Sequence, residues 1–356
     1  MLYAAPSLGR AEREVLARID EIRPRIRFVS ADRAPTTRSL LASFFSAESD
    51  DVVVDPTAQR RSRGSENPAF AGYRDAIGYV LALHDDPHFV YHESLLKSLH
   101  YMTLAHDPDR RPGRWRTQPI RVQGTGLWEV LYEPPAPEAV PELMAELMAT
   151  LNESSEIPTL VRAALAHLDL VQIHPFADGN GRIGRALQTL VIVRAGILDP
   201  EFSSLEWSIA RDRDRYRESI AELGPAWDPR ANTRPFVRFC LRAHLHQAER
   251  ALARASRMSA AWTEAASEVT RRRLPERVVS ALADAALTGA VEIASYRWWA
   301  GISGPRARAD LEGLVEGGWL RRRAGSRRYE AGPRLRAMGR RIRASHPEPA
   351  PPDPFR

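Results

Sequence analysis

One twelve-residue segment carries the strongest structural signal in this chain: His174-Pro175-Phe176-Ala177-Asp178-Gly179-Asn180-Gly181-Arg182-Ile183-Gly184-Arg185. It lies between two apolar stretches, 163–173 and 186–193, which predict helices. Pro175 is expected to end the first helix, and Gly179 to Gly181 allow backbone N–H groups to converge where the second helix begins. Because the N-terminus of a helix also favours negative charge, the segment predicts a phosphate site.

The side chains of this segment fit the same prediction. Arg182 and Arg185 are three residues apart on one helix face, so their guanidinium groups are suited to successive phosphates. Asp178 is a candidate oxygen ligand for magnesium bridging those phosphates. His174 is the group able to accept a proton near neutral pH. The structural alternatives are a core or capping histidine, a helix-capping aspartate and two solvated arginines.

The segment resembles the signature of the Fic family, His-x-Phe-x-Asp/Glu-Gly-Asn-Gly-Arg-x-x-Arg, at every specified position. Two further stretches agree with the resemblance. The first, Pro112 to Arg116 followed by Val122 and Gly124, is similar to the flap of the family, and the second, 132–144, is similar to the lead into its central helices. The resemblance extends over residues 35–250.

The resemblance implies transfer of AMP from ATP to a Ser, Thr or Tyr hydroxyl of a target protein, with Mg²⁺ bound. It implies that His174 is the base and that Asp178 binds the metal. The remaining roles implied are an α-phosphate contact by Asn180, an anion hole at Gly179 and Gly181, a phosphate contact by Arg182, a γ-phosphate contact by Arg185, and target docking at the flap residues Ile120, Val122 and Gly124. The same family loop also serves de-AMPylation and phosphate or phosphocholine transfer.

A regulatory feature is predicted upstream. Many Fic proteins carry an inhibitory helix, Ser/Thr-x-x-x-Glu-Gly/Asn, whose glutamate pairs with the last arginine of the signature. Glu48 is the candidate here, in the stretch 37–49. Phe44 stands where Ser or Thr is expected and Ser49 where Gly or Asn is expected, so an ordinary exposed glutamate is the alternative.

The C-terminal part of the chain has a different character. Residues 271–346 contain 17 arginines against seven acidic residues. The order of predicted elements over 274–346 resembles a winged helix-turn-helix, with Arg306 and Arg308 on the recognition helix and Arg321 to Arg328 on the wing. The charge is typical of DNA binding, and a winged helix that binds protein or dimerises stays an equal alternative.

Composition completes the domain prediction. The chain has 356 residues, 44% of them hydrophobic, and Cys240 is its single cysteine, which we expect in the core. No signal peptide or membrane span is expected, and the arginine bias is typical of a GC-rich, bacterial genome, so we expect a cytoplasmic protein.

The predicted fold is mainly α, a Fic helical core with a short β-hairpin flap (120–122 with 128–131) and a C-terminal winged helix. The predicted divisions are an N-terminal helical region with the candidate inhibitory helix (1–110), the catalytic core (111–250), a helical linker (251–273), the winged helix (274–346) and a disordered tail (347–356).

The sequence therefore predicts a protein adenylyltransferase. The alternative from another class is a DNA-binding regulator whose Fic core acts as a ligand sensor or scaffold. Duplex DNA and a second copy of the chain in a homodimer are the partners left open besides the target protein.

Overall fold

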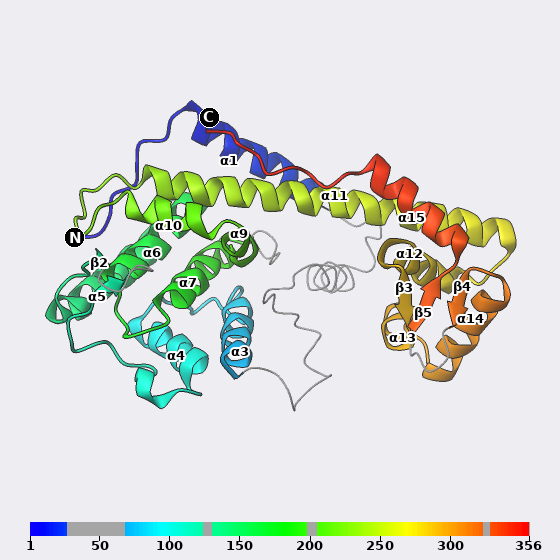
Figure 1. Ribbon diagram of the computed structural model, residues 1–356, viewed down its shortest axis with the longest axis horizontal. Helices are drawn as coiled ribbons and strands as arrows, with labels where there is room; N and C mark the ends of the chain where they lie inside the picture. The colour runs from blue at the N-terminus through cyan, green and yellow to red at the C-terminus, as the bar shows by residue number, and fades with distance from the viewer. Residues whose placement is uncertain (27–67, 124–129, 198–204, 323–327, 356) are drawn as a thin grey trace. The chain divides into compact units, whose positions relative to one another are not determined.

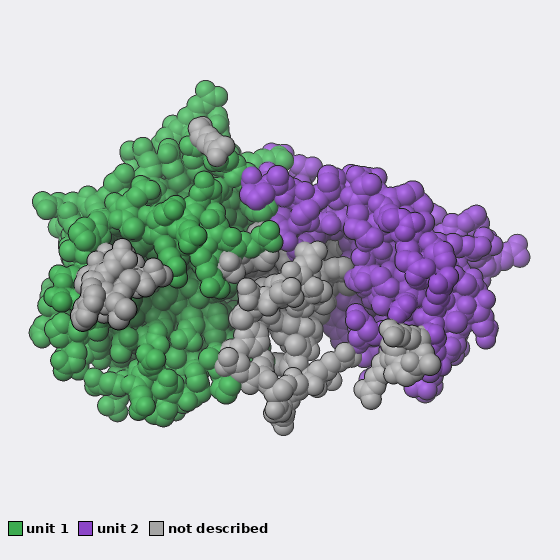
Figure 2. Space-filling model, viewed as in Figure 1, with its two compact units in different colours: residues 1–19, 38–247, 352–356 green, residues 20–37, 248–351 purple. Residues whose placement is uncertain are grey.

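The computed structural model describes residues 1–26, 68–123, 130–197, 205–322 and 328–355 (Figure 1). It is mainly helical, which confirms the predicted class. The chain forms two compact units, drawn in two colours in Figure 2. Unit 1 comprises 1–19, 38–247 and 352–356, and unit 2 comprises 20–37 and 248–351. The change of unit at Gln247 falls within one uninterrupted helix, α11 (Arg234–Arg272), which contributes residues to both units.

Helices dominate unit 1. In chain order they are α1 (Arg10–Ile22, whose last three residues belong to unit 2), α3 (Pro68–Ala82), α4 (Glu93–Leu104), α5 (Val140–Asn152), α6 (Thr159–Ile173), α7 (Asn180–Arg194), α9 (Glu206–Arg211), α10 (Arg213–Ala221) and the first part of α11, with single 3₁₀ turns at Pro108–Arg110 and Pro137–Ala139.

Helices α6 and α7 form the centre of unit 1, side by side in Figure 1. Almost every residue of α6 is buried, as expected for a helix surrounded by others. The two helices approach closely at Gly184, where a Cβ atom would lie 2.7 Å from the ring of His167 and 3.0 Å from Val171. Since the signature segment connects these two helices, their close packing fixes both ends of that segment.

A short hairpin precedes α5. Strand β1 (Val122–Gln123) pairs antiparallel with β2 (Val130–Tyr132), close to the hairpin predicted from the sequence. The phenol of Tyr132 is buried and donates to the carbonyl of Gln172 at 2.8 Å, near the end of α6. This contact attaches the second strand directly to the central helix pair.

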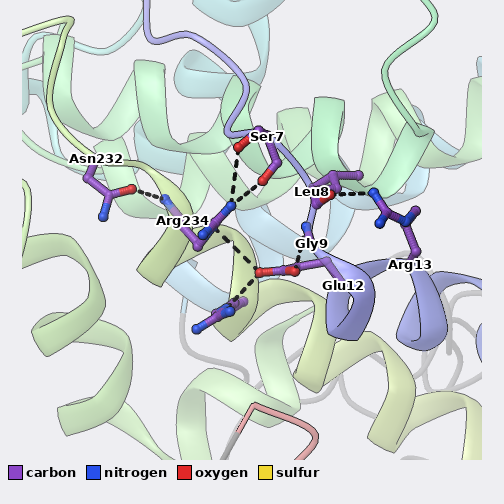
Figure 3. A network of polar contacts seen from close by, with 8 residues as sticks. Ser7, Leu8, Gly9, Glu12, Arg13, Asn232 and Arg234 are labelled. Atoms are coloured by element: carbon purple, nitrogen blue, oxygen red, sulfur yellow. Dashed lines mark hydrogen bonds and ion pairs between the residues drawn. The ribbon is translucent and has the colours of Figure 1, made fainter.

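The N-terminal segment is tied to α11 by a polar network around Glu12, shown in Figure 3. Glu12 is 1% exposed and accepts from the Gly9 N–H at 2.9 Å and from Arg238 Nε at 2.8 Å. Arg234 lies 3.6 Å from the same carboxylate and also donates to the carbonyl of Ser7. Burial alone would raise the pKa of Glu12, and these hydrogen bonds and the Arg238 charge lower it below its ordinary value.

In its described residues, unit 2 combines helices with a small sheet, and it also includes the end of α1 and the 3₁₀ turn Arg23–Arg25. Its elements are the rest of α11, α12 (Val279–Thr288), β3 (Ala290–Glu292), α13 (Ile293–Ala300), α14 (Gly304–Glu316), β4 (Leu320–Arg322), β5 (Arg328–Ala331) and α15 (Pro333–Ser345), with a 3₁₀ turn at Glu276–Val278. The sheet is antiparallel in the order β3-β5-β4. Neither β3 nor α15 is predicted from the sequence. Helix α15 packs so closely on α12 that a Cβ at Gly339 would lie 1.9 Å from the Ala286 carbonyl oxygen.

Three further features bear on the sequence predictions. Cys240 is fully buried in α11. The tail after α15 is extended, and its Glu348 forms ion pairs with Arg250 and Arg257. Among the described residues, none of the helices combines the length and the apolar character required to cross a bilayer.

Candidate active site

His174 lies directly after α6, where the backbone changes direction. It caps the helix in the left-handed conformation (φ 52°), and its N–H donates to the Leu170 carbonyl at 3.0 Å. Its Nδ1 is 3.0 Å from the Val171 carbonyl oxygen, which only accepts, so Nδ1 carries the proton and Nε2 has a free lone pair. Burial lowers the pKa of His174, which keeps this lone pair available at neutral pH.

The loop after His174 is closed by Asn180. The Asn180 side chain accepts from the Phe176 N–H at 2.9 Å and donates to the Phe176 carbonyl at 2.8 Å. Gly179 follows with φ 78°, and α7 begins at Asn180. The first N–H groups of a helix have no intrahelical partner, so the backbone at Gly181 and Arg182 presents donors at the positive end of α7. This geometry suits an anion.

Asp178 lies at the rim of the loop. Its side chain is 42% exposed, its Oδ2 is 3.5 Å from Arg110, and its Oδ1 accepts from the Gly179 N–H at 2.6 Å. The residue that caps α7 is Gly179, and no side chain provides the cap. The Asp178 carboxylate therefore faces outward, where a cation can reach it.

The two signature arginines differ in their surroundings. The Arg182 side chain is partly exposed and makes no hydrogen bond or ion pair with the part of the chain that the structure describes. Arg185 donates from Nε to Glu206 at 2.6 Å, and its NH1 would lie 3.3 Å from a Cβ placed on Gly181. Burial alone would lower the pKa of Arg185, but Glu206 and Tyr73 raise it, so the guanidinium stays charged.

Two residues outside the signature, His100 and Trp115, pack against the loop. His100 is fully buried, stacks on Phe176, and makes hydrogen bonds with the backbone of Gly113 and Asp178. Trp115 also packs against Phe176, with 4.7 Å between the ring centroids. Phe176 is itself fully buried, so its ring anchors the loop in the core.

Arg116 supports the loop through its backbone carbonyls. It is 4% exposed, donates from Nε to the His174 carbonyl at 2.8 Å, and donates to the carbonyl of Pro135 as well. Its own N–H donates to the Pro175 carbonyl at 2.8 Å. A buried guanidinium that serves several carbonyls holds the turn between α6 and the loop in one conformation.

Behind Arg185 lies a chain of buried polar side chains. His167 Nδ1 lies 2.6 Å from Gln188 and its Nε2 lies 3.1 Å from the hydroxyl of Tyr216. Gln188 continues to His244 at 3.2 Å. Burial lowers the pKa of His167 to about 3, so it is neutral at physiological pH.

The structure thus brings seven predicted residues together in one loop and helix start: His174, Asp178, Gly179, Asn180, Gly181, Arg182 and Arg185. Ile120 and Val122 lie at the start of the hairpin. Glu48 and Gly124 lie outside the described residues. Sequence reasoning missed His100 and Glu206, which carry no local pattern. Tyr73 and Arg116 lie in stretches that resemble the family, but no role at the site was predicted for them.

Comparison with known proteins agrees with this geometry. Residues 90–192, which hold the signature loop and the helices beside it, match the model of the Fic/DOC family. The chain is 26% identical over 257 residues to the protein adenylyltransferase Fic of Nematostella vectensis, which covers 67% of this chain and 56% of that protein. It is 36% identical over 123 residues to the protein adenylyltransferase fic-1 of Caenorhabditis elegans. This alignment covers 33% of this chain and 22% of that protein. The chain therefore spans about half the length of the first relative and about a fifth of the length of the second.

Solved structures show that the fold is shared. A Fic family protein from Desulfovibrio desulfuricans G20 aligns with a TM-score of 0.53 at 22% identity, covering 92% of this chain and 98% of that chain. A Fic domain containing signaling protein from Bacteroides thetaiotaomicron VPI-5482 aligns with a TM-score of 0.51 at 19% identity, covering 69% and 97%.

Proposed function

We propose that this protein transfers AMP from ATP to a hydroxyl side chain of a target protein. The observation that carries the proposal is the position of the free Nε2 of His174 one short loop before the anion-binding start of α7. The names of the curated relatives, protein adenylyltransferase, support the same reaction.

Only a few groups of the site take part in the proposed reaction. Nε2 of His174 accepts the proton of the target hydroxyl, whose oxygen attacks the α-phosphorus of ATP. The bond to the β-phosphate breaks and pyrophosphate leaves. The backbone N–H groups of Gly181 and Arg182, the helix dipole and the Arg182 side chain stabilise the negative charge on the α- and β-phosphates, and Arg185 contacts the γ-phosphate. The N–H of Gly179 donates to Asp178 instead. The Asn180 amide makes its hydrogen bonds to Phe176, so its contribution is to hold the loop shape.

The residues present fit a magnesium ion that is shared with the nucleotide. The described residues contain no group of three or more His, Cys, Asp or Glu side chains arranged to hold a metal alone. Magnesium often uses one or two carboxylates together with substrate phosphates, and the outward-facing Asp178 is such a carboxylate. When bound, the ion would neutralise phosphate charge and orient the polyphosphate.

Target docking is proposed at the hairpin. Ile120, Val122 and Gly124 belong to the segment around β1, a strand of only two residues paired on one side with β2. An extended stretch of the target would add main-chain hydrogen bonds along such an edge, which would bring its hydroxyl toward His174.

ATP labelled at the α or the γ position tests the reaction. AMP transfer leaves the α label, and not the γ label, on a protein in co-incubated lysate or on the enzyme itself. Transfer of the γ label alone would instead support phosphate transfer, and release of AMP from a modified protein would support de-AMPylation. Absence of both labels from every protein, with nucleotide bound, would contradict the proposal.

Self-inhibition by Glu48 stays part of the proposal, because this residue lies outside the described part of the chain. Glu48→Gly should raise self-modification if its carboxylate obstructs Arg185. An unchanged rate would end this idea.

A second candidate function is DNA binding by unit 2. The order helix, strand, helix, helix, strand, strand from α12 to β5 favours a winged helix, and Ser303 caps the helix α14 that would enter the groove. However, Arg306, Arg322 and Arg328 are paired with Asp310, Glu312 and Glu292. Among the described arginines of the predicted recognition helix and wing, binding would then depend on the exposed Arg308 and Arg321. Salt-dependent duplex binding that is lost in the Arg308→Ala/Arg321→Ala double variant and kept in His174→Ala would support it.

A further inference from the structure

Glu206 is the residue that most clearly acts on the site without belonging to the signature. It is the first residue of α9, 21 positions after Arg185 in the chain. One oxygen, Oε1, accepts both from Nε of Arg185 at 2.6 Å and from the hydroxyl of Tyr73 on α3. The pair is well covered, with side-chain exposures of 17% for Arg185 and 25% for Glu206.

The geometry of this pair leaves part of the guanidinium available. Glu206 engages Nε, whereas NH1 lies against Gly181 in the first turn of α7. A guanidinium has five N–H donors in a fixed plane, so an anchor at one edge orients the others. The free edge is turned toward the start of α7, where the phosphate site lies.

Tyr73 strengthens this anchor. Its ring lies under the Arg185 guanidinium, with 6.0 Å from Cζ to the ring centroid, while its hydroxyl holds the acceptor oxygen of Glu206. Burial, together with the negative charge of Glu206, raises the pKa of Tyr73 well above its ordinary value, so the phenol keeps the proton that it donates. Arg185 is thus confined by two residues from two helices.

We propose that Glu206 is a positioning residue: with Tyr73 it fixes Arg185 so that its NH1 and NH2 groups meet the terminal phosphate of the nucleotide. This rests on the proposed function, and it deepens it by assigning recognition of a triphosphate, rather than a diphosphate, to the Arg185–Glu206–Tyr73 cluster. A long arginine loses considerable side-chain entropy when it is ordered, and the ion pair supplies that order before the ligand binds.

A carboxylate beside a phosphate site also admits the opposite role. Glu206 repels an arriving phosphate, so a purely obstructive carboxylate would weaken ATP binding and its removal would strengthen it. The two roles predict opposite signs for the same variants. Hydrogen bonding through one oxygen to Nε, with the other edge of the guanidinium directed to the loop, favours positioning.

The experiment measures binding of Mg-ATP and Mg-ADP to the full chain by calorimetry, together with KM and kcat for AMP transfer. Glu206→Ala should weaken ATP binding about tenfold or more and leave ADP binding within about twofold. Glu206→Gln keeps an acceptor oxygen for both donors and should stay within about threefold of the original chain for both nucleotides. Tyr73→Phe should give a smaller loss for ATP alone. The exposed Glu222→Ala is the matched control for loss of one acidic charge and should change neither nucleotide.

Three results would overturn the proposal: equal or tighter ATP binding in Glu206→Ala, a parallel loss of ATP and ADP binding, or failure of the original chain to bind either nucleotide. The first two, with AMP transfer intact, leave the proposed function standing. The expected ATP-selective loss in a chain that binds ATP but transfers no AMP would support the role of Glu206 and contradict the proposed function.

Discussion

The imidazole of His100 lies flat against the ring of Phe176, with centroids 3.7 Å apart and planes 5° from parallel. The edge of the same imidazole makes two hydrogen bonds whose directions are fixed. Gly113 N–H donates to Nδ1 at 2.8 Å, so Nε2 carries the proton and donates to the Asp178 carbonyl at 3.1 Å. One buried ring therefore connects the segment before the hairpin to the phosphate loop.

Replacing this ring should loosen the loop. We expect His100→Ala to cost about 2–4 kcal/mol of unfolding free energy, because it removes a buried aromatic contact and leaves a backbone donor and an acceptor without partners. Urea denaturation followed by tryptophan fluorescence measures this change. His106→Ala, at an exposed position, is the control, and an equally small effect in both variants would contradict the assigned role.

Stability should fall in mild acid because of two buried histidines. Burial lowers the pKa of His100 to about 4 and that of His167 to about 3, from an ordinary 6.5. Below pH 6.5 the unfolded chain takes up protons that the folded chain refuses, so unfolding becomes easier as the pH falls from 6.5 toward 4. Each histidine contributes up to about 1.4 kcal/mol per pH unit in that window.

Denaturation midpoints at pH 7.5 and 5.0 measure this effect. We expect the difference between the two midpoints to shrink in His167→Gln, compared with the original chain. A difference that is unchanged in that variant would show that other groups, such as carboxylates, control the acid sensitivity.

His174→Ala should remove the base and keep the binding site. We expect AMP transfer to fall about 10²–10⁴-fold, since a general base contributes this range. Calorimetry with Mg-ATP should still detect binding, because the phosphate contacts come from α7 and its preceding glycines. Full turnover in the variant would exclude His174 as the base.

Arg116→Lys tests the buried support of the loop. Lysine keeps the charge and loses the planar set of donors that reach the carbonyls of His174 and Pro135. We expect a loss of about 2–3 kcal/mol in unfolding free energy, measured in urea, together with reduced transfer. Arg121→Lys, at an exposed arginine in an ion pair with Glu133, should be close to neutral.

Unit 2 offers a matched pair of helical glycines. Gly339→Ala should disrupt unit 2, because the new Cβ would meet the Ala286 carbonyl oxygen at 1.9 Å. Gly313→Ala in α14 has open space around its Cβ and should stabilise the helix by up to about 1 kcal/mol. Thermal unfolding measured by calorimetry distinguishes the two. Equal transition temperatures in the two variants would show that the close contact between α12 and α15 is easily lost.

Local signals were enough for the signature loop and the two helices beside it. Pro175, the glycines and the apolar runs act on their own neighbours, and the structure follows them. Helix α15 was missed, although its buried residues Leu335, Met338 and Ile342 recur at the helical spacing of three and four residues. Glu206 and Tyr73 contact Arg185 from 21 and 112 positions away, and His100 contacts Asp178 from 78 positions away. Only tertiary packing defines such contacts.

Cys240 has a practical consequence for such experiments. It is the single sulfhydryl group of the chain and is fully buried on α11. Because burial raises the pKa of its thiol, little of the reactive thiolate form is present. A cysteine introduced at an exposed position such as Ser94 would consequently be the main target for a maleimide dye without removal of the native one. Fluorophores placed this way on each unit would report by energy transfer how far apart the two units stand in solution.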